Sequence, residues 1–123
     1  MTIERARTPT EAILRYINRG RWQVRIRSMS DQNLWGQCVY RDYEVRLDVL
    51  HVLTSPDADV LGTIAHELAH VIACNEPDDD WHGEFWRETY KELRQWLLNG
   101  TPCDWLGEVP AHIEAWQERR NTM

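Results

Sequence analysis

The sequence has few cysteines and no long apolar segment. Its cysteines are Cys38, Cys74 and Cys103, an odd number at wide spacing. They therefore support neither a disulfide framework nor a Cys-x-x-Cys metal site. No run approaches the roughly 20 apolar residues that span a bilayer, and the first residues lack the apolar core of a signal peptide. We therefore expect reduced thiols, a cytoplasmic location and no membrane partner.

The length is that of one domain. A chain of 123 residues can build a modest hydrophobic core without disulfide bonds. The sequence shows no internal repeat, linker or low-complexity stretch. We predict a single domain over residues 1–123, with a core at about residues 8–98 and a C-terminal extension at residues 99–123.

The net charge of -6 argues against a broadly nucleic-acid-binding surface. The charge is nevertheless uneven, because residues 1–50 carry nine arginines against six acidic residues. A candidate basic patch for weak nucleic-acid contact contains Arg19, Arg21, Trp22, Arg25 and Arg27. Alternating arginines are also typical of the solvated face of a strand, and we favour that interpretation.

Local sequence patterns predict an α+β fold. Thr8-Pro9-Thr10-Glu11 has the form of a capping box, and Gly20 marks the expected end of this first helix. Alternating apolar residues predict three strands, which we expect to form an antiparallel meander. These strands cover residues 22–27, 34–40 and 43–53. Three further helices are predicted at residues 60–73, 83–98 and 110–119.

The most informative motif is His66-Glu67-Leu68-Ala69-His70, inside the apolar-periodic stretch at residues 60–73. Residues four apart share a helix face, so both imidazoles can bind one ion while Glu67 lies beside an open coordination position. This is the pattern of a zinc peptidase. The competing interpretation is a pair of hydrogen-bonded core histidines, which would require two imidazoles and a carboxylate to be buried together.

A catalytic zinc site usually takes three protein ligands, so a third ligand is needed. Pro77 and the acidic residues after it predict a turn, from which His82 would return over the motif helix. His82 is the preferred third ligand. Glu76, Glu84 and Glu88 are the competing donors.

The motif and the residues around it resemble a known family. The His-Glu-x-x-His string, followed by His82-Gly83 and Phe85-Trp86, is similar to the SprT-like zinc metallopeptidase domain, which includes the Spartan-type proteases. Gly36-Gln37-Cys38 and the strand that starts at Tyr43 extend the resemblance over about residues 10–98. No zinc-ribbon cysteine pairs follow, so the chain looks like a minimal form of this family.

The resemblance implies a small zincin-like domain that binds Zn²⁺. It implies that His66, His70 and His82 are the metal ligands and that Glu67 is the catalytic acid/base. It also implies a protein or peptide substrate, with DNA-associated proteins as a candidate class. The strand before the motif helix is expected to pair with an extended substrate.

Several functional assignments stay open at the level of sequence. One alternative is a zinc-stabilised protein- or nucleic-acid-binding module without catalysis, and another is a hydrolase of non-peptide amides. The candidates for stabilising the oxyanion are Tyr43, Tyr90 and His112, and Trp81 is a candidate wall of the cleft. We expect Trp86 and Trp96 to lie in the core, and His51 to be an ordinary surface or hydrogen-bonded histidine outside the metal site.

Overall fold

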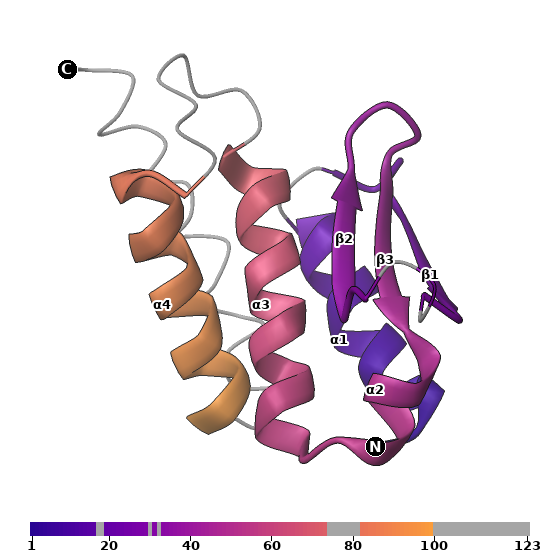
Figure 1. Ribbon diagram of the computed structural model, residues 1–123. Helices are drawn as coiled ribbons and strands as arrows, with labels where there is room; N and C mark the ends of the chain where they lie inside the picture. Colours follow the sequence, from indigo (N-terminus) through magenta and orange to yellow (C-terminus); the bar gives the residue numbers. More distant parts are fainter. Residues whose placement is uncertain (17–18, 30, 32, 74–81, 100–123) are drawn as a thin grey trace, which may run out of the picture.

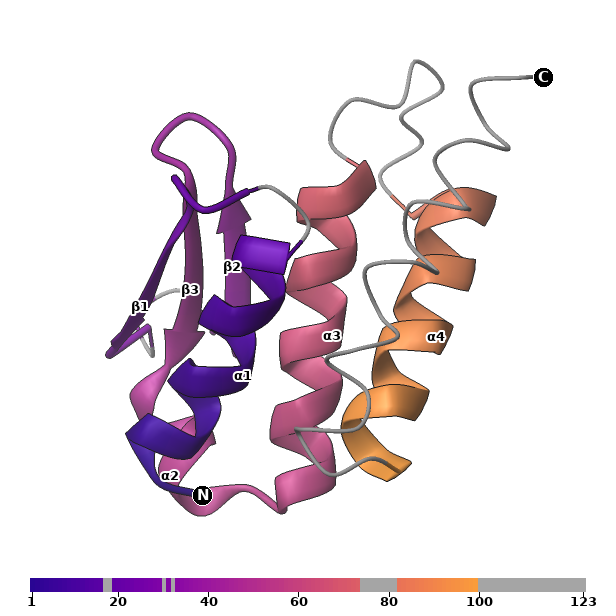
Figure 2. The same cartoon turned by 180° about the vertical axis from the view of Figure 1, so that it is seen from behind.

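The computed structural model describes residues 1–16, 19–29, 31, 33–73 and 82–99. The chain forms an α+β domain, as predicted, in which α3 lies between a three-stranded sheet and α4 (Figure 1). Helix α1 covers one face of the sheet (Figure 2). The helices are α1 (Ile3–Tyr16), α2 (Val49–Thr54), α3 (Asp57–Ala73) and α4 (Glu84–Asn99). The strands are β1 (Gln23–Arg27), β2 (Gly36–Val39) and β3 (Glu44–Asp48).

The sheet is mixed, so the prediction of an antiparallel meander was wrong for one strand pair. The strand order is β1-β3-β2, with β2 antiparallel and β1 parallel to β3. The short connection at residues 40–43 fixes the β2–β3 hairpin. The longer connection at residues 28–35 lets β1 reach the opposite edge of β3, where Val24 aligns with Val45.

The third strand is shorter than predicted, because Asp48 ends it and starts a helix. Its carboxylate accepts hydrogen bonds from the backbone N–H groups of Met29, at 2.8 Å, and His51, at 3.0 Å. The second bond is a helix N-cap. Residues 49–53 were predicted as strand although they form a helix, because a short apolar run fits both a strand and a helix.

The first helix begins earlier than predicted. Helix α1 starts at Ile3 and contains Pro9, so the proposed capping box lies inside the helix. The Thr2 hydroxyl accepts a hydrogen bond from Arg5 N–H at 3.1 Å and satisfies the N-terminus instead. Thr10 is fully buried, and its hydroxyl donates to the carbonyl of Ala6 at 2.8 Å.

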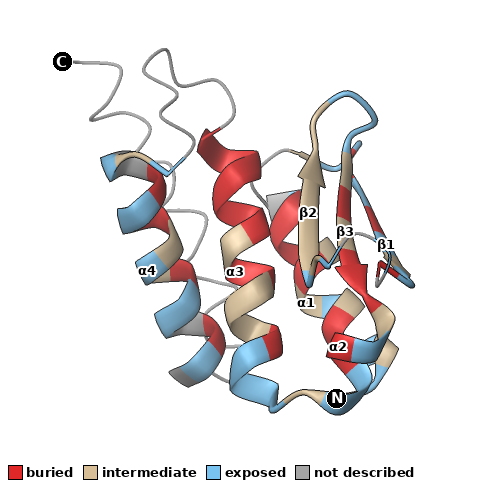
Figure 3. Cartoon of the chain, in the orientation of Figure 1, coloured by how far each residue is buried: buried red, intermediate tan, exposed pale blue. Residues whose placement is uncertain are grey.

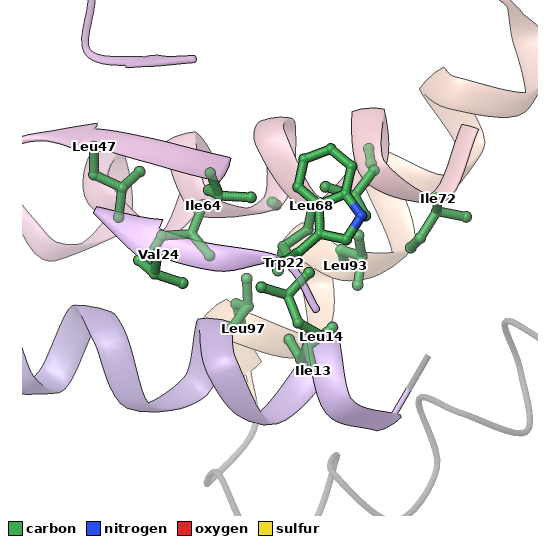
Figure 4. Packing of buried hydrophobic residues seen from close by; sticks show 14 of the residues in the cluster. Ile13, Leu14, Trp22, Val24, Leu47, Ile64, Leu68, Ile72, Leu93 and Leu97 are labelled. Atoms are coloured by element: carbon green, nitrogen blue, oxygen red, sulfur yellow. The ribbon is translucent and has the colours of Figure 1, made fainter. Parts of the chain in front are cut away.

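One hydrophobic core joins the sheet, α1, α3 and α4. Ile64 and Leu68 of α3 lie at its centre, with Ile13 of α1, Leu47 of β3 and Leu93 of α4 around them (Figure 4). The buried residues of α3 run through its C-terminal part, where the motif lies (Figure 3). The motif is therefore held on a rigid helix whose apolar face is fully covered.

Some sequence predictions concern residues outside the described ranges. These are the helix at residues 110–119, the placement of Cys74, Cys103, Glu76, Trp81 and His112, and the side chain of Trp96. The division into a core and a C-terminal extension stays a prediction. None of the helices within the described ranges is both long and apolar enough to cross a membrane.

Candidate metal centre

Three histidines from two segments of the chain converge beside α3. His66 and His70 lie one turn apart on α3, and His82 lies two residues before α4. Their ligand-type nitrogen atoms all lie within 4.8 Å of one another. The ring centroids are 5.0 Å apart for His66 and His70, 5.2 Å for His66 and His82, and 4.9 Å for His70 and His82. The described structure therefore brings together the three residues named as ligands from the sequence.

The donor set fits a metal ion such as zinc. Zinc–nitrogen bonds of about 2.0–2.1 Å place tetrahedral ligands about 3.3 Å apart, so small side-chain rotations would close the centre. Burial, with the neighbouring imidazoles of His66 and His82, lowers the pKa of His70 to about 4. Burial also lowers the pKa of His66. Both rings are therefore neutral at pH 7, which is the form that coordinates metals.

Two of the rival third ligands, Glu84 and Glu88, do not join this group. Among the described residues, the cluster of potential metal donors contains the three histidines alone. Glu84 and Glu88 are exposed on α4. His82, rather than either carboxylate, lies beside His66 and His70.

Trp86 forms one wall of the centre. Its ring centroid lies 4.8 Å from that of His66, 5.2 Å from that of His70 and 4.5 Å from that of His82. Trp86 is buried, as predicted for a core residue. A rigid aromatic ring in contact with all three imidazoles limits their rotation, and it makes the centre partly dry on that side.

Glu67 lies beside the histidines and is almost fully buried. Its Oε2 atom is 4.0 Å from Nε2 of His66. Burial raises the pKa of the carboxyl group to about 8. A cation held by the histidines would favour the ionised carboxylate and oppose this shift. The side chain is therefore placed to exchange a proton near neutral pH.

Strand β2 approaches Glu67 so closely that Gly36 is needed at the contact. A Cβ atom at Gly36 would lie 2.8 Å from Cγ2 of Thr63 and 3.1 Å from Oε2 of Glu67. Thr63 cannot move freely, because its hydroxyl bonds to Nε2 of His51 at 2.8 Å and to the carbonyl of Asp59 at 3.1 Å. Gly36 thus sets the distance between the sheet and the centre, a role that the sequence did not reveal.

Replacing Gly36 by alanine is expected to lower the free energy of unfolding by about 1–3 kcal/mol, because the added methyl group overpacks this contact. The matched control is Gly20→Ala, where a new Cβ would meet nothing within 4 Å. We expect the free energy of unfolding of this control to stay within about 0.5 kcal/mol of that of the natural chain. Urea denaturation measures both changes, and equal stabilities for the two variants would contradict the close contact.

An open cleft of about 470 Å³ extends from the centre along α3. Its walls are residues 33–36 before and at the start of β2, one face of α3 from Ala58 to Glu67, and Tyr90 and Arg94 of α4. Tyr90 is held by parallel stacking on Trp86, with ring centroids 5.1 Å apart. Tyr43 instead contacts Trp22 and Arg21. Of the described candidates for stabilising an oxyanion, Tyr90 is therefore the one that lines the cleft.

His51 lies outside the metal centre, as expected. It is buried in α2, and its Nδ1 atom bonds to Oγ of Ser55 at 2.8 Å. Its Nε2 atom bonds to Thr63, one turn before Glu67, and so links α2 to α3. Burial lowers the pKa of His51, so the ring stays neutral.

Arg25 of β1 and Arg46 of β3 form an ion-pair network with nearby acidic residues. Arg25 and Arg46 both bind Glu44, at 2.7 Å and 2.8 Å, and Arg46 also binds Asp42 at 3.2 Å. These two arginines hold the pKa of Glu44 below its usual value, Arg46 contributing more. Arg25 and Arg27 are exposed and alternate with the inward-facing Val24 and Ile26, so this part of the pattern is a solvated strand face, and the charge of Arg25 is offset by Glu44.

Comparison with known proteins identifies one family. The model of the SprT-like family matches residues 7–114, a range that includes the three histidines and Glu67. No curated protein and no solved structure matches the chain.

Proposed function

The chain belongs to the SprT-like family, and from this membership we propose that it is a zinc-dependent endopeptidase. One observation carries the proposal: three histidines converge beside a buried glutamate at the head of an open cleft. A structural zinc site would be closed and would not need the carboxylate. The family suggests metal dependence, and the donor chemistry favours zinc.

In the proposed mechanism, His66, His70 and His82 would hold the ion beside the carboxylate of Glu67. When bound, zinc supplies Lewis-acid chemistry that acidifies water and polarises a carbonyl group. Glu67 accepts the proton of the attacking water and passes it to the leaving amine. Trp86 keeps the imidazoles in place, and Gly36 allows the sheet to approach the reacting atoms.

The substrate is proposed to pair with β2. The strand directly before the motif, β3, was expected to do so, but it is the central strand and both its edges are occupied. Within the described part of the chain β2 pairs with β3 alone, and its start contacts Glu67. An extended peptide added to this edge would pass the carboxylate. The protein is thus expected to cut unfolded or flexible segments.

Two alternatives differ in what they require of Glu67. A non-catalytic zinc-stabilised module would not need a buried carboxylate beside the open side of the centre, and it would keep its partner after Glu67→Gln. A hydrolase of non-peptide amides would share the whole centre. Parallel assays on denatured protein and on small amides separate it from a peptidase.

We further propose that the substrates include DNA-associated proteins and that the protein acts in the cytoplasm. The excess of arginine in residues 1–50 supports a weak DNA contact. Arg25 is paired with Glu44, so Arg27, which is exposed at the end of β1, is the more available cation.

Binding of single-stranded DNA is expected to weaken with salt and to depend on these arginines. Removing two phosphate contacts lowers the slope of log affinity against log salt by about 1.4. Fluorescence anisotropy with the Arg25→Gln/Arg27→Gln variant measures this change, and the exposed Arg87→Gln serves as control. An unchanged slope, or no effect of DNA on cleavage at low salt, would count against a DNA role.

A further inference from the structure

Trp35 is a large apolar side chain exposed at the wall of the cleft. It is 61% exposed, whereas Trp22 and Trp86 are buried. It lies directly before Gly36, whose backbone contacts Glu67. Successive residues of a strand advance about 3.3 Å, so Trp35 is one or two residues away from the reacting position along β2.

The ring of Trp35 is held in place although it is exposed. It stacks on His51 with centroids 4.5 Å apart and planes 10° from parallel. His51 is buried, and each of its two ring nitrogens shares a hydrogen bond with a hydroxyl group, Nδ1 with that of Ser55 and Nε2 with that of Thr63. The carbonyl of Trp35 accepts a hydrogen bond from Asp48 N–H at 2.9 Å. A preorganised aromatic surface binds a ligand at little further cost in conformational entropy.

The part of the cleft at Trp35 offers an apolar surface to a ligand. Leu34 adjoins the tryptophan, and Tyr90 lines the cleft from α4. Beyond the metal centre, the charged residues that line the cleft are Asp59 and Arg94, whose charges offset each other. A nucleic-acid strand would need an excess of cations for its phosphates, which the lining does not offer. A peptide side chain needs only the aromatic and apolar surface.

We propose that Trp35 is the platform of a specificity subsite that accepts an aromatic or bulky apolar side chain of the substrate, next to the scissile bond. This inference rests on the proposed peptidase function and names the class of peptide that it prefers. Trp35 acts here as a specificity-determining residue. The stack on His51 supplies its orientation.

The test compares peptide pairs that differ by Phe or Ala at each position flanking the cleaved bond. In the natural chain, kcat/KM is expected to be about tenfold higher for the Phe peptide at one of these positions. In Trp35→Ala, the ratio of kcat/KM for the Phe peptide to that for the Ala peptide should fall to about one. The kcat/KM for the Ala peptide should stay within about twofold of its value in the natural chain. Trp35→Phe should keep most of the preference for the Phe peptide. Leu53→Ala, which removes an exposed apolar side chain that is not part of the cleft lining, is the matched control.

Binding provides a second readout that does not require turnover. Fluorescein-labelled Phe and Ala peptides are titrated into zinc-loaded Glu67→Gln protein, with and without Trp35→Ala, and followed by anisotropy. A preference for the Phe peptide that is lost with Trp35 supports the subsite, even if the natural chain cleaves no peptide and the peptidase proposal fails. A preference for the Phe peptide, in cleavage or in binding, that stays the same in Trp35→Ala overturns the subsite proposal. So does displacement of the peptide by a short oligothymidylate whose own binding requires Trp35.

Discussion

Replacing Glu67 by glutamine is expected to reduce peptide-bond cleavage by about 100- to 10,000-fold, which is the usual contribution of a general acid/base. Glutamine has nearly the same shape, so it should fit the buried space beside Gly36 without steric conflict. It can neither accept the proton of the attacking water nor deliver one to the leaving amine. The variant should therefore keep its fold and its zinc while it loses turnover.

The assay follows cleavage of a denatured, fluorescently labelled protein, with zinc content measured on the same samples. Glu88→Gln is the matched control, because it removes a carboxylate from the exposed face of α4, outside the histidine cluster. Full activity in Glu67→Gln would show that this carboxylate is not the acid/base. Loss of zinc from Glu67→Gln would instead assign it to the support of the metal centre.

Replacing His82 by alanine is expected to weaken zinc binding by more than about 100-fold, since even loss of a group that only supports a ligand costs 10- to 100-fold. His82 is exposed and contributes no side chain to the hydrophobic core. The metal-free variant should therefore unfold at nearly the same denaturant concentration as the metal-free natural chain. The loss would be specific to the metal.

The measurement is zinc per chain by mass spectrometry after dialysis against a weak chelator, with the natural chain expected to retain about one ion. Glu84→Gln and Glu88→Gln serve as controls for the rival third ligands and should retain zinc. If His82→Ala keeps its zinc and either glutamate variant loses it, the third ligand is that carboxylate. A folded natural chain that retains no zinc in this dialysis assay would contradict the zinc site altogether.

The sequence was informative wherever the physical cause is local. The spacing of His66 and His70 places both on one helix face because the helix repeats every 3.6 residues, and this needs no knowledge of the rest of the chain. The apolar face of the same helix predicted its burial for the same reason. Local patterns also predicted the α+β class and the number of strands.

Local patterns failed where another part of the chain decided the outcome. The strand expected at residues 43–53 ends at Asp48, because the carboxylate caps α2 and binds Met29, a residue far away in the sequence. The start of α1 was placed too late, since a Thr-Pro-Thr-Glu string has the same form inside a helix as before one. The parallel pairing of β1 with β3 depends on the path of a connection that carries no pattern of its own.

The candidate site divides in the same way. The sequence by itself determined the pair of histidines on one helix, the adjacent glutamate and the choice of a third histidine as the preferred ligand. The tertiary structure alone decided that His82 returns to this pair, that Gly36 of β2 abuts Glu67, and that Trp35 stacks on His51 at the wall of the cleft. The physical reason is that helix periodicity acts between neighbours along the chain. Contacts between separate elements depend instead on how the whole core packs, and no short pattern encodes that packing.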